Sequence, residues 1–255
     1  SKNKLYFNYP DDYQLYKAIS KYYNLKIENL AIGFGATDII YRTLQSLPIS
    51  KLYIVKPSFA MVSIYCEILG IKYKFINFNE IYKIKSKNSS LYLVSPNGNN
   101  GQVYNAHGLI HKFKFLICDE VYGDFYDKYS LLKLNLKNLI VIKSLSKSLG
   151  LAGLRVGFSK SSLDITKKIQ NCRLSQIASS HSCYIIPKII GETKKVISRM
   201  NTTKKYLENK YKCKKSFSNY VLFESKNKYT RKFKCKKING YYRMALTDME
   251  TLEGL

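Results

Sequence analysis

The sequence contains no tryptophan, only 5 prolines and only 17 acidic residues among 255. Its apolar runs are short, and none approaches the ~20 residues that a membrane-spanning helix needs. The first residues, Ser1-Lys2-Asn3-Lys4, lack the apolar stretch of a secretory signal. We therefore expect a cytoplasmic protein that has no membrane partner.

The 6 cysteines are widely scattered, without a C-x-x-C pair or a cluster with histidine. This spacing argues against a zinc site and against a disulfide framework. The sequence predicts free thiols in a reducing compartment and no bound metal.

The scarcity of acid leaves the chain strongly basic, since 43 lysines and arginines against 17 acidic residues give a net charge of +26. Such a charge attracts polyanions. However, the basic residues are spread along the chain, and the densest stretch, 204–237, alternates them with tyrosine, phenylalanine and cysteine. It carries no nucleic-acid-binding signature. We expect no specific nucleic-acid partner, although a non-enzymatic polyanion-binding protein stays open as an alternative.

The most informative stretch is 144–157, SLSKSLGLAGLRVG, which follows the apolar run 139–142. It places Lys147 among small hydroxyl residues, and a lysine that loses its proton can form an imine with an aldehyde. The hydroxyls of Ser144 and Ser146 and the forked guanidinium of Arg155 suit a phosphate group. The stretch therefore predicts a pyridoxal 5'-phosphate (PLP) site with Lys147 as the Schiff-base residue.

A second apolar run, 115–118, ends in Asp119. In open α/β sheets, ligands bind at the carboxyl ends of the strands. A buried carboxylate there needs a cationic partner, and a protonated pyridine nitrogen would be one. Asp119 is therefore predicted to hold that proton and keep the cofactor an electron sink.

A glycine turn, Gly33-Phe34-Gly35, precedes a segment with helical character. The first turn of a helix has free backbone N–H groups that converge on an anion. The turn therefore predicts an anion site, and two glycines without the third make it a weak dinucleotide motif.

The stretch 144–157 resembles the T-[LF]-S-K-x-x-G-L-A-G-L-R-[VI]-G signature of fold-type I PLP-dependent aminotransferases (class I and II), especially the histidinol-phosphate aminotransferase branch. The other motifs follow in the family's order over nearly the whole chain. The resemblance implies that Ala36 and Thr37 bind the cofactor phosphate, that Phe59 stacks on the pyridine ring, and that Tyr122 contacts its phenolic oxygen.

The resemblance implies three further contacts. The loop 95–101, SPNGNNG, is similar to the [NS]-P-N-x-P-T-G loop, so Asn97, or alternatively Asn99, would reach the phenolic oxygen. Tyr9, in a Y-P-D segment, would reach the cofactor of the partner subunit, which implies a homodimer. Arg243, in a final R-[IVM]-x-[IL] strand, would bind the substrate carboxylate.

Strands alternate with helices up to Gly157, which predicts a three-layer αβα large domain with a mainly parallel sheet. A small α+β domain follows it. We expect an N-terminal segment and helix (1–25) that joins the small domain, a PLP-binding large domain (26–187) and a small C-terminal domain (188–255). Helices are expected over 163–178 and within 187–211.

The predicted function is transfer of an amino group from a small-molecule donor, an amino acid or amino-phosphate compound, to a keto acid acceptor. Lys147, once freed from the cofactor, would act as general base and acid. A PLP-dependent decarboxylase or lyase acting on a phosphorylated amino acid is the alternative within the same chemistry.

Overall fold

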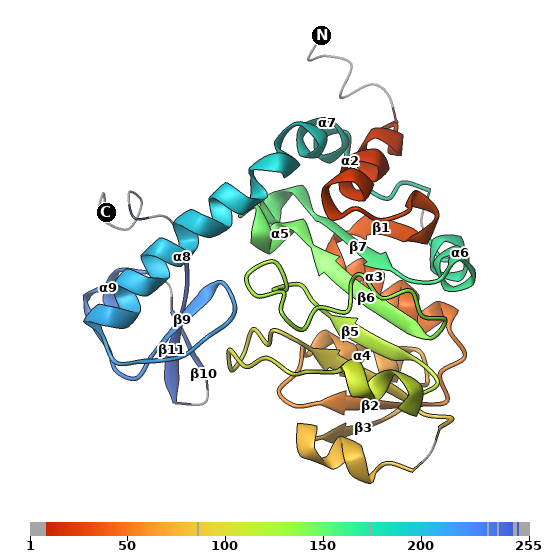
Figure 1. Ribbon diagram of the computed structural model, residues 1–255, viewed down its shortest axis with the longest axis horizontal. Coiled ribbons are helices and arrows are strands. Elements are labelled where there is room, and N and C mark those ends of the chain that lie inside the picture. The colour runs from red at the N-terminus through yellow and green to blue at the C-terminus, as the bar shows by residue number, and fades with distance from the viewer. Residues whose placement is uncertain are drawn as a thin grey trace.

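The computed structural model describes residues 9–85, 87–173, 175–233, 235–238, 240–246 and 249. Two sheets organise these residues, a large one of seven strands and a small one of four. Figure 1 shows the large sheet with its helices on one side of the molecule and the small sheet on the other, joined by the long helix α8.

The large sheet has the strand order β1-β7-β6-β5-β4-β2-β3. All neighbouring strands are parallel except at β7, which is antiparallel to both β1 and β6. The prediction of a mainly parallel sheet is confirmed. The strands are β1 (Leu30–Phe34), β2 (Lys51–Val55), β3 (Lys72–Ile76), β4 (Ser90–Val94), β5 (Leu116–Asp119), β6 (Leu139–Ser144) and β7 (Val156–Lys160).

Helices cover both faces of this sheet and give the predicted three-layer αβα arrangement. One face packs against α3 (Gly35–Ser46), α4 (Met61–Ile68) and α6 (Leu163–Asn171). The other face packs against α2 (Tyr13–Tyr23), the 3-10 turn η3 (His107–Lys112) and α7 (Ser180–Ile189). Alternate side chains of a strand point to opposite faces, so a strand that is covered on both sides reads as one continuous apolar run.

The helix α2 packs on the large sheet, and it also contacts residues 190–192, which lie in the range expected for the small domain. Its predicted membership of the small domain stays a prediction. Leu15 and Ile19 are fully buried in the same cluster as the strands of the large sheet. At its last turn, the Tyr23 hydroxyl donates a 2.8 Å hydrogen bond to Asp124, which also forms a 2.6 Å ion pair with Lys143 of β6. The apolar face of α2 was visible in the sequence, but the element that it packs against was not.

The small sheet has the order β10-β11-β9-β8 and is antiparallel throughout. Leu207 of α8 packs against Val221 and Phe223 and closes a separate hydrophobic cluster. The strand expected around Arg243 is present and spans Tyr241–Ala245. The elements of this part are α8 (Thr193–Lys210), α9 (Lys228–Lys232), β8 (Cys213–Lys214), β9 (Tyr220–Phe223), β10 (Lys236–Ile238) and β11 (Tyr241–Ala245).

Two predicted helices have different limits in the structure. The helix expected over 163–178 ends as α6 at Asn171, and the one expected within 187–211 is divided. Its first part belongs to α7, and the chain then passes through the turn η5 (Ile190–Glu192) before α8 begins. Gly191 lies in that turn, where its low helix propensity favours a break. The remaining short elements are η1 (Ile27–Asn29), η2 (Phe78–Lys83), α5 (Leu145–Ser148) and η4 (Ala152–Leu154).

None of the helices in the described ranges is both long and apolar enough to cross a lipid bilayer.

Candidate active site

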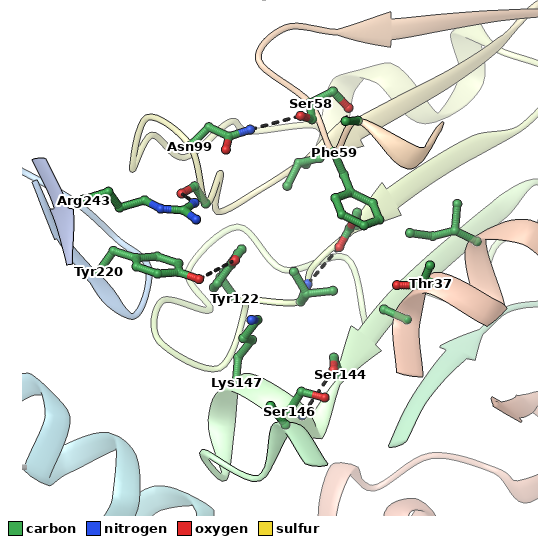
Figure 2. A pocket seen from close by; sticks show the side chains of 18 of the residues that line it. Thr37, Ser58, Phe59, Asn99, Tyr122, Ser144, Ser146, Lys147, Tyr220 and Arg243 are labelled. Carbon is green, nitrogen blue, oxygen red and sulfur yellow. Dashed lines mark hydrogen bonds between the residues drawn. The ribbon is translucent and has the colours of Figure 1, made fainter. Parts of the chain in front are cut away.

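A cavity of about 430 Å³ opens where the large sheet faces the small domain. The carboxyl ends of β2, β4, β5 and β6 lead into it, which is the edge where open α/β sheets bind ligands. Strands β9, β10 and β11 of the small domain form its opposite wall, and Figure 2 shows the side chains between them. The residues that line it include Ala36, Thr37, Ser58, Phe59, Gly98, Asn99, Asp119, Tyr122, Ser144, Ser146, Lys147, Arg155, Tyr220, Lys236 and Arg243.

The glycine turn brings the N-terminus of α3 to this cavity. Gly35 has a φ of 79°, a conformation that favours glycine. The Asp38 carboxylate then accepts a 3.0 Å hydrogen bond from the Phe34 N–H and pairs with Arg42 at 2.8 Å. Residues 36 and 37 therefore lie in the first turn of α3, where backbone N–H groups lack intrahelical acceptors. Both line the cavity, as the prediction for Ala36 and Thr37 requires.

Arg155 and two serines complete a cradle for an anion at this end. Arg155 has a left-handed φ of 49°. Its guanidinium packs against Gly35, since a Cβ atom on residue 35 would lie only 2.6 Å from Nη2 of Arg155. The Ser144 hydroxyl accepts a 3.2 Å hydrogen bond from the Ser146 N–H. The buried Ser146 hydroxyl has no hydrogen-bond partner within the described part of the chain. A buried hydroxyl without a partner is costly, and a bound phosphate would supply one.

Lys147 lies beside this cradle in α5. It is half-buried, and its side chain extends into the cavity toward Tyr122 (Figure 2). Lys147 and Asp119 thus line one cavity, which is the arrangement that the sequence predicts for an amine and an acid on either side of a cofactor.

The Asp119 carboxylate is buried at the end of β5. It accepts a 2.5 Å hydrogen bond from the Tyr92 hydroxyl and a 3.1 Å hydrogen bond from the Val121 N–H. No ion pair to Asp119 occurs among residues 9–246 as far as they are described. Burial raises the pKa of Asp119 to about 6, because the charged form loses its hydration. A cationic ring nitrogen would provide the missing charge, so this carboxylate fits the pyridine end of PLP.

Phe59 supplies an aromatic face between these two ends. Its side chain is 40% exposed, and Figure 2 shows the ring projecting into the cavity from the loop after β2. The cavity thus contains an anion cradle, an amine, a carboxylate without a cationic partner among the described residues, and an aromatic ring. These residues fit PLP.

Tyr122 and Arg243 meet at the small-domain wall. The Tyr122 hydroxyl lies 3.5 Å from the Tyr220 hydroxyl, and burial raises the pKa of Tyr122. The Arg243 guanidinium donates a 2.7 Å hydrogen bond from Nη1 to the Gly98 carbonyl. It also lies over the Tyr220 ring at 4.1 Å from the centroid.

The two asparagines proposed for the phenolic oxygen have different positions. The Asn97 amide closes its own loop, since it donates to the Pro57 carbonyl at 2.6 Å and accepts from the Asn99 N–H at 2.9 Å. Asn97 does not line the cavity, whereas Asn99 does, and Asn99 donates to the Ser58 carbonyl at 3.0 Å. Of the two, Asn99 alone lies at the cavity, and the contact with the phenolic oxygen stays a prediction.

Tyr9 lies outside the cavity of its own chain and is 86% exposed. A residue that serves a partner subunit would be exposed in a single chain, so its role stays a prediction.

Sequence reasoning did not assign four residues that shape this site, namely Tyr92, Gly98, Tyr220 and Lys236. Tyr92 could have been noticed as the one hydroxyl-bearing aromatic in the apolar run 91–94. Lys236 is one lysine among many, and its place opposite Arg243 depends on strand pairing.

The fold and the cavity define a PLP-dependent enzyme of fold type I. The sequence profile of the family aminotransferase class I and II matches residues 1–217. The chain belongs to the aminotransferase class I and II family and is a PLP-dependent aminotransferase.

A histidinol-phosphate aminotransferase from Caldanaerobacter subterraneus subsp. tengcongensis is 29% identical over 253 residues, which cover 86% of this chain and 70% of that protein. The chain spans about half the length of two further histidinol-phosphate aminotransferases, from Pyrococcus furiosus and Archaeoglobus fulgidus.

Among solved structures, the histidinol-phosphate aminotransferase of Clostridium acetobutylicum superposes with a TM-score of 0.76 at 21% identity, over 99% of this chain and 89% of that one. This likeness confirms the fold. Family membership favours the enzyme over the non-enzymatic polyanion-binding alternative.

Proposed function

We propose that the chain transfers an amino group to a keto acid from a donor that carries a second anionic group, and that Lys147 moves the proton in this reaction. The charge balance of the cavity carries the proposal. Its described lining includes four cationic side chains, Lys147, Arg155, Lys236 and Arg243, but Asp119 alone as an acid.

Two of these cations are accounted for by the cofactor. Arg155 would bind the phosphate, and Lys147 would hold the aldehyde carbon. PLP, when bound, supplies an electron sink for the charge that develops at the substrate Cα. Asp119 would keep the proton on the ring nitrogen, and Phe59 would orient the ring by stacking.

The other two cations lie together on the small-domain wall. Arg243 of β11 and Lys236 of β10 are direct partners in an antiparallel pair. Like charges in this position destabilise a sheet, and an anion between them relieves the repulsion. Arg243 would bind the α-carboxylate with its planar fork, and Lys236 would contact a second carboxylate or a phosphate on the donor.

Lys147 would move the proton. Its amine would take a proton from the substrate Cα and return it at the neighbouring carbon of the cofactor, acting as general base and then as general acid. We also propose that the enzyme works as a cytoplasmic homodimer in which the partner subunit's Tyr9 completes the phosphate site.

The test compares amino donors on the PLP-loaded enzyme with 2-oxoglutarate as acceptor. Aspartate and phosphoserine are the donors that carry a second anionic group, and asparagine and serine are their matched controls without it. We expect formation of the corresponding keto acid, with kcat/KM at least about tenfold higher for the donors that carry the second anionic group. Equal rates would contradict the substrate class, and carbon dioxide release without transamination would contradict the reaction.

A further inference from the structure

We propose that Tyr220 is a positioning residue for two active-site groups on different domains: its ring face orients Arg243, and its hydroxyl orients Tyr122. Neither the family signature nor the proposed reaction assigns a role to this side chain. The inference rests on the proposed function only in the role given to Arg243 as the carboxylate-binding residue.

Tyr220 faces the active site and not the core of its own domain. It begins β9, where Val221 and Phe223 belong to the hydrophobic cluster under α8 and Tyr220 does not. Its side chain is buried and lines the cavity instead. Alternation along the strand therefore directs Tyr220 toward the large domain.

The ring of Tyr220 fixes one side of the substrate-binding arginine. The Arg243 guanidinium lies 4.1 Å from the ring centroid, within the range of a cation–π contact. On another side, Nη1 donates to the Gly98 carbonyl at 2.7 Å. This is the one side-chain hydrogen bond of Arg243 recorded in the described residues, so most of its five N–H donors stay available to a carboxylate.

The hydroxyl of Tyr220 reaches the large domain. It lies 3.5 Å from the Tyr122 hydroxyl, and the two rings meet edge to face at 5.8 Å. Tyr122 also packs against Gly98, where a Cβ would be 2.4 Å from the ring. Tyr122 is thus held between a glycine of the large domain and a tyrosine of the small domain, as Figure 2 shows for the two hydroxyls.

One side chain therefore connects the group that would bind the substrate carboxylate with the group that would contact the cofactor oxygen. A phenylalanine would keep the ring contact with Arg243 and lose the contact with Tyr122. A leucine would lose both. The phenylalanine variant therefore tests the contact with Tyr122, and the leucine variant also tests the contact with Arg243. If Tyr220 served only to pack the interface, its two contacts would not be lost separately.

The experiment uses the PLP-loaded enzyme and three variants: Tyr220→Phe, Tyr220→Leu and, as a control, Tyr229→Phe. Tyr229 is a buried tyrosine in the small-domain cluster and lies outside the cavity. The dissociation constant of glutarate, a non-reacting dicarboxylate, is measured by titration calorimetry. The pH dependence of the cofactor's visible absorption band and of kcat is recorded in parallel, and thermal unfolding checks that each variant is folded.

For Tyr220→Phe we expect glutarate binding within about twofold of the wild type, together with a shifted pH dependence of the absorption band and of kcat. For Tyr220→Leu we expect the same spectral change and glutarate binding about tenfold weaker, because the cation–π contact is lost. Tyr229→Phe should leave each of these readouts unchanged.

An unshifted absorption band in Tyr220→Phe would overturn the role toward Tyr122, and wild-type glutarate binding in Tyr220→Leu would overturn the role toward Arg243. If Tyr220→Leu does not fold, the absorption band of Tyr220→Phe decides the proposal alone, and an unchanged band overturns it. Glutarate binding and the absorption band do not depend on turnover. A failure of transamination with every donor therefore counts against the proposed function and leaves this test intact.

Discussion

The hydroxyl of Tyr92 donates a 2.5 Å hydrogen bond to the carboxylate of Asp119, and both side chains are buried at the centre of the large sheet. The two residues lie on the neighbouring parallel strands β4 and β5. The tyrosine therefore fixes the orientation of the carboxylate that faces the cavity. It also stabilises the charged form and so opposes the effect of burial on the pKa of Asp119.

Replacing Tyr92 by phenylalanine should weaken cofactor binding. The change leaves a buried carboxylate oxygen without its donor, which costs about 1–3 kcal/mol and favours the protonated acid. A protonated Asp119 cannot pair with a cationic ring nitrogen, so the PLP dissociation constant should rise about tenfold in a fluorescence titration. Tyr73→Phe is the matched control, because Tyr73 donates to Glu67 at 2.7 Å on the exposed surface. Equal affinity in the two variants would contradict the role of Tyr92.

Asp119 should make the stability of the cofactor-free protein depend on pH. Its folded-state pKa of about 6 lies above the ordinary 3.8, so between these values the folded protein keeps a proton that the unfolded chain releases. Stability therefore falls as the pH rises from about 4 to about 6. Above pH 6 the free energy of unfolding is lower by about 3 kcal/mol, since a pKa shift of one unit corresponds to 1.36 kcal/mol.

Urea denaturation of the cofactor-free Asp119→Asn variant tests this loss of stability. At pH 7 the variant should be more stable than the wild type, because it has no buried charge. At pH 4 the two proteins should have similar stability, because Asp119 of the folded wild type is protonated there. Asp164→Asn, which alters an exposed ion pair with Lys168, serves as the control and should show a small effect at both pH values. A wild-type protein that gains stability between pH 4 and pH 6 relative to Asp119→Asn would refute this assignment.

Removing the Ser146 hydroxyl should weaken phosphate binding without loss of stability. This buried hydroxyl has no partner in the part of the chain that the structure describes. Ser146→Ala should therefore fold at least as well as the wild type and bind PLP about tenfold more weakly, because a charge-assisted hydrogen bond is lost. Ser159→Ala removes another buried hydroxyl without a described partner, outside the cavity, and should leave PLP affinity unchanged. An unaltered PLP affinity in Ser146→Ala would remove Ser146 from the phosphate site.

A side chain at position 98 should displace Tyr122. The Cβ of Gly98→Ala would lie 2.4 Å from the Tyr122 ring, which lies between two domains and has little room to move. We expect kcat to fall about tenfold or more, since small displacements of active-site groups have large effects. Gly108→Ala, where a Cβ meets nothing within 4 Å, is the control. Wild-type kcat in Gly98→Ala would mean that the position of Tyr122 does not matter.

The sequence predicted the parts of the site that depend on local pattern. The apolar run before Asp119 places that carboxylate at a strand end, and the segment around Lys147 carries its hydroxyls and arginine within a few residues. Both predictions need only the order of residues along one strand and one turn. The alternation of strands and helices likewise predicted the three layers.

The sequence did not predict contacts between distant segments. The pairing of Tyr122 with Tyr220 joins residues 98 positions apart, and the docking of α2 depends on Tyr23 and Asp124, 101 positions apart. An amphipathic pattern shows that a helix has a buried face but not which element covers it. The choice between Asn97 and Asn99 also depends on loop geometry, because side chains of this type often bond to their own backbone.

The position of the cofactor-bearing amine is the central claim, and peptide mapping tests it most directly. The purified protein is loaded with one equivalent of PLP, reduced with borohydride, digested and examined by mass spectrometry. We predict that the mass of the reduced cofactor appears on the peptide that contains Lys147, and that Lys147→Ala loses both this label and the visible absorption band. Label on another lysine with none on Lys147, or a wild-type protein that stays colourless with saturating PLP, would contradict the account.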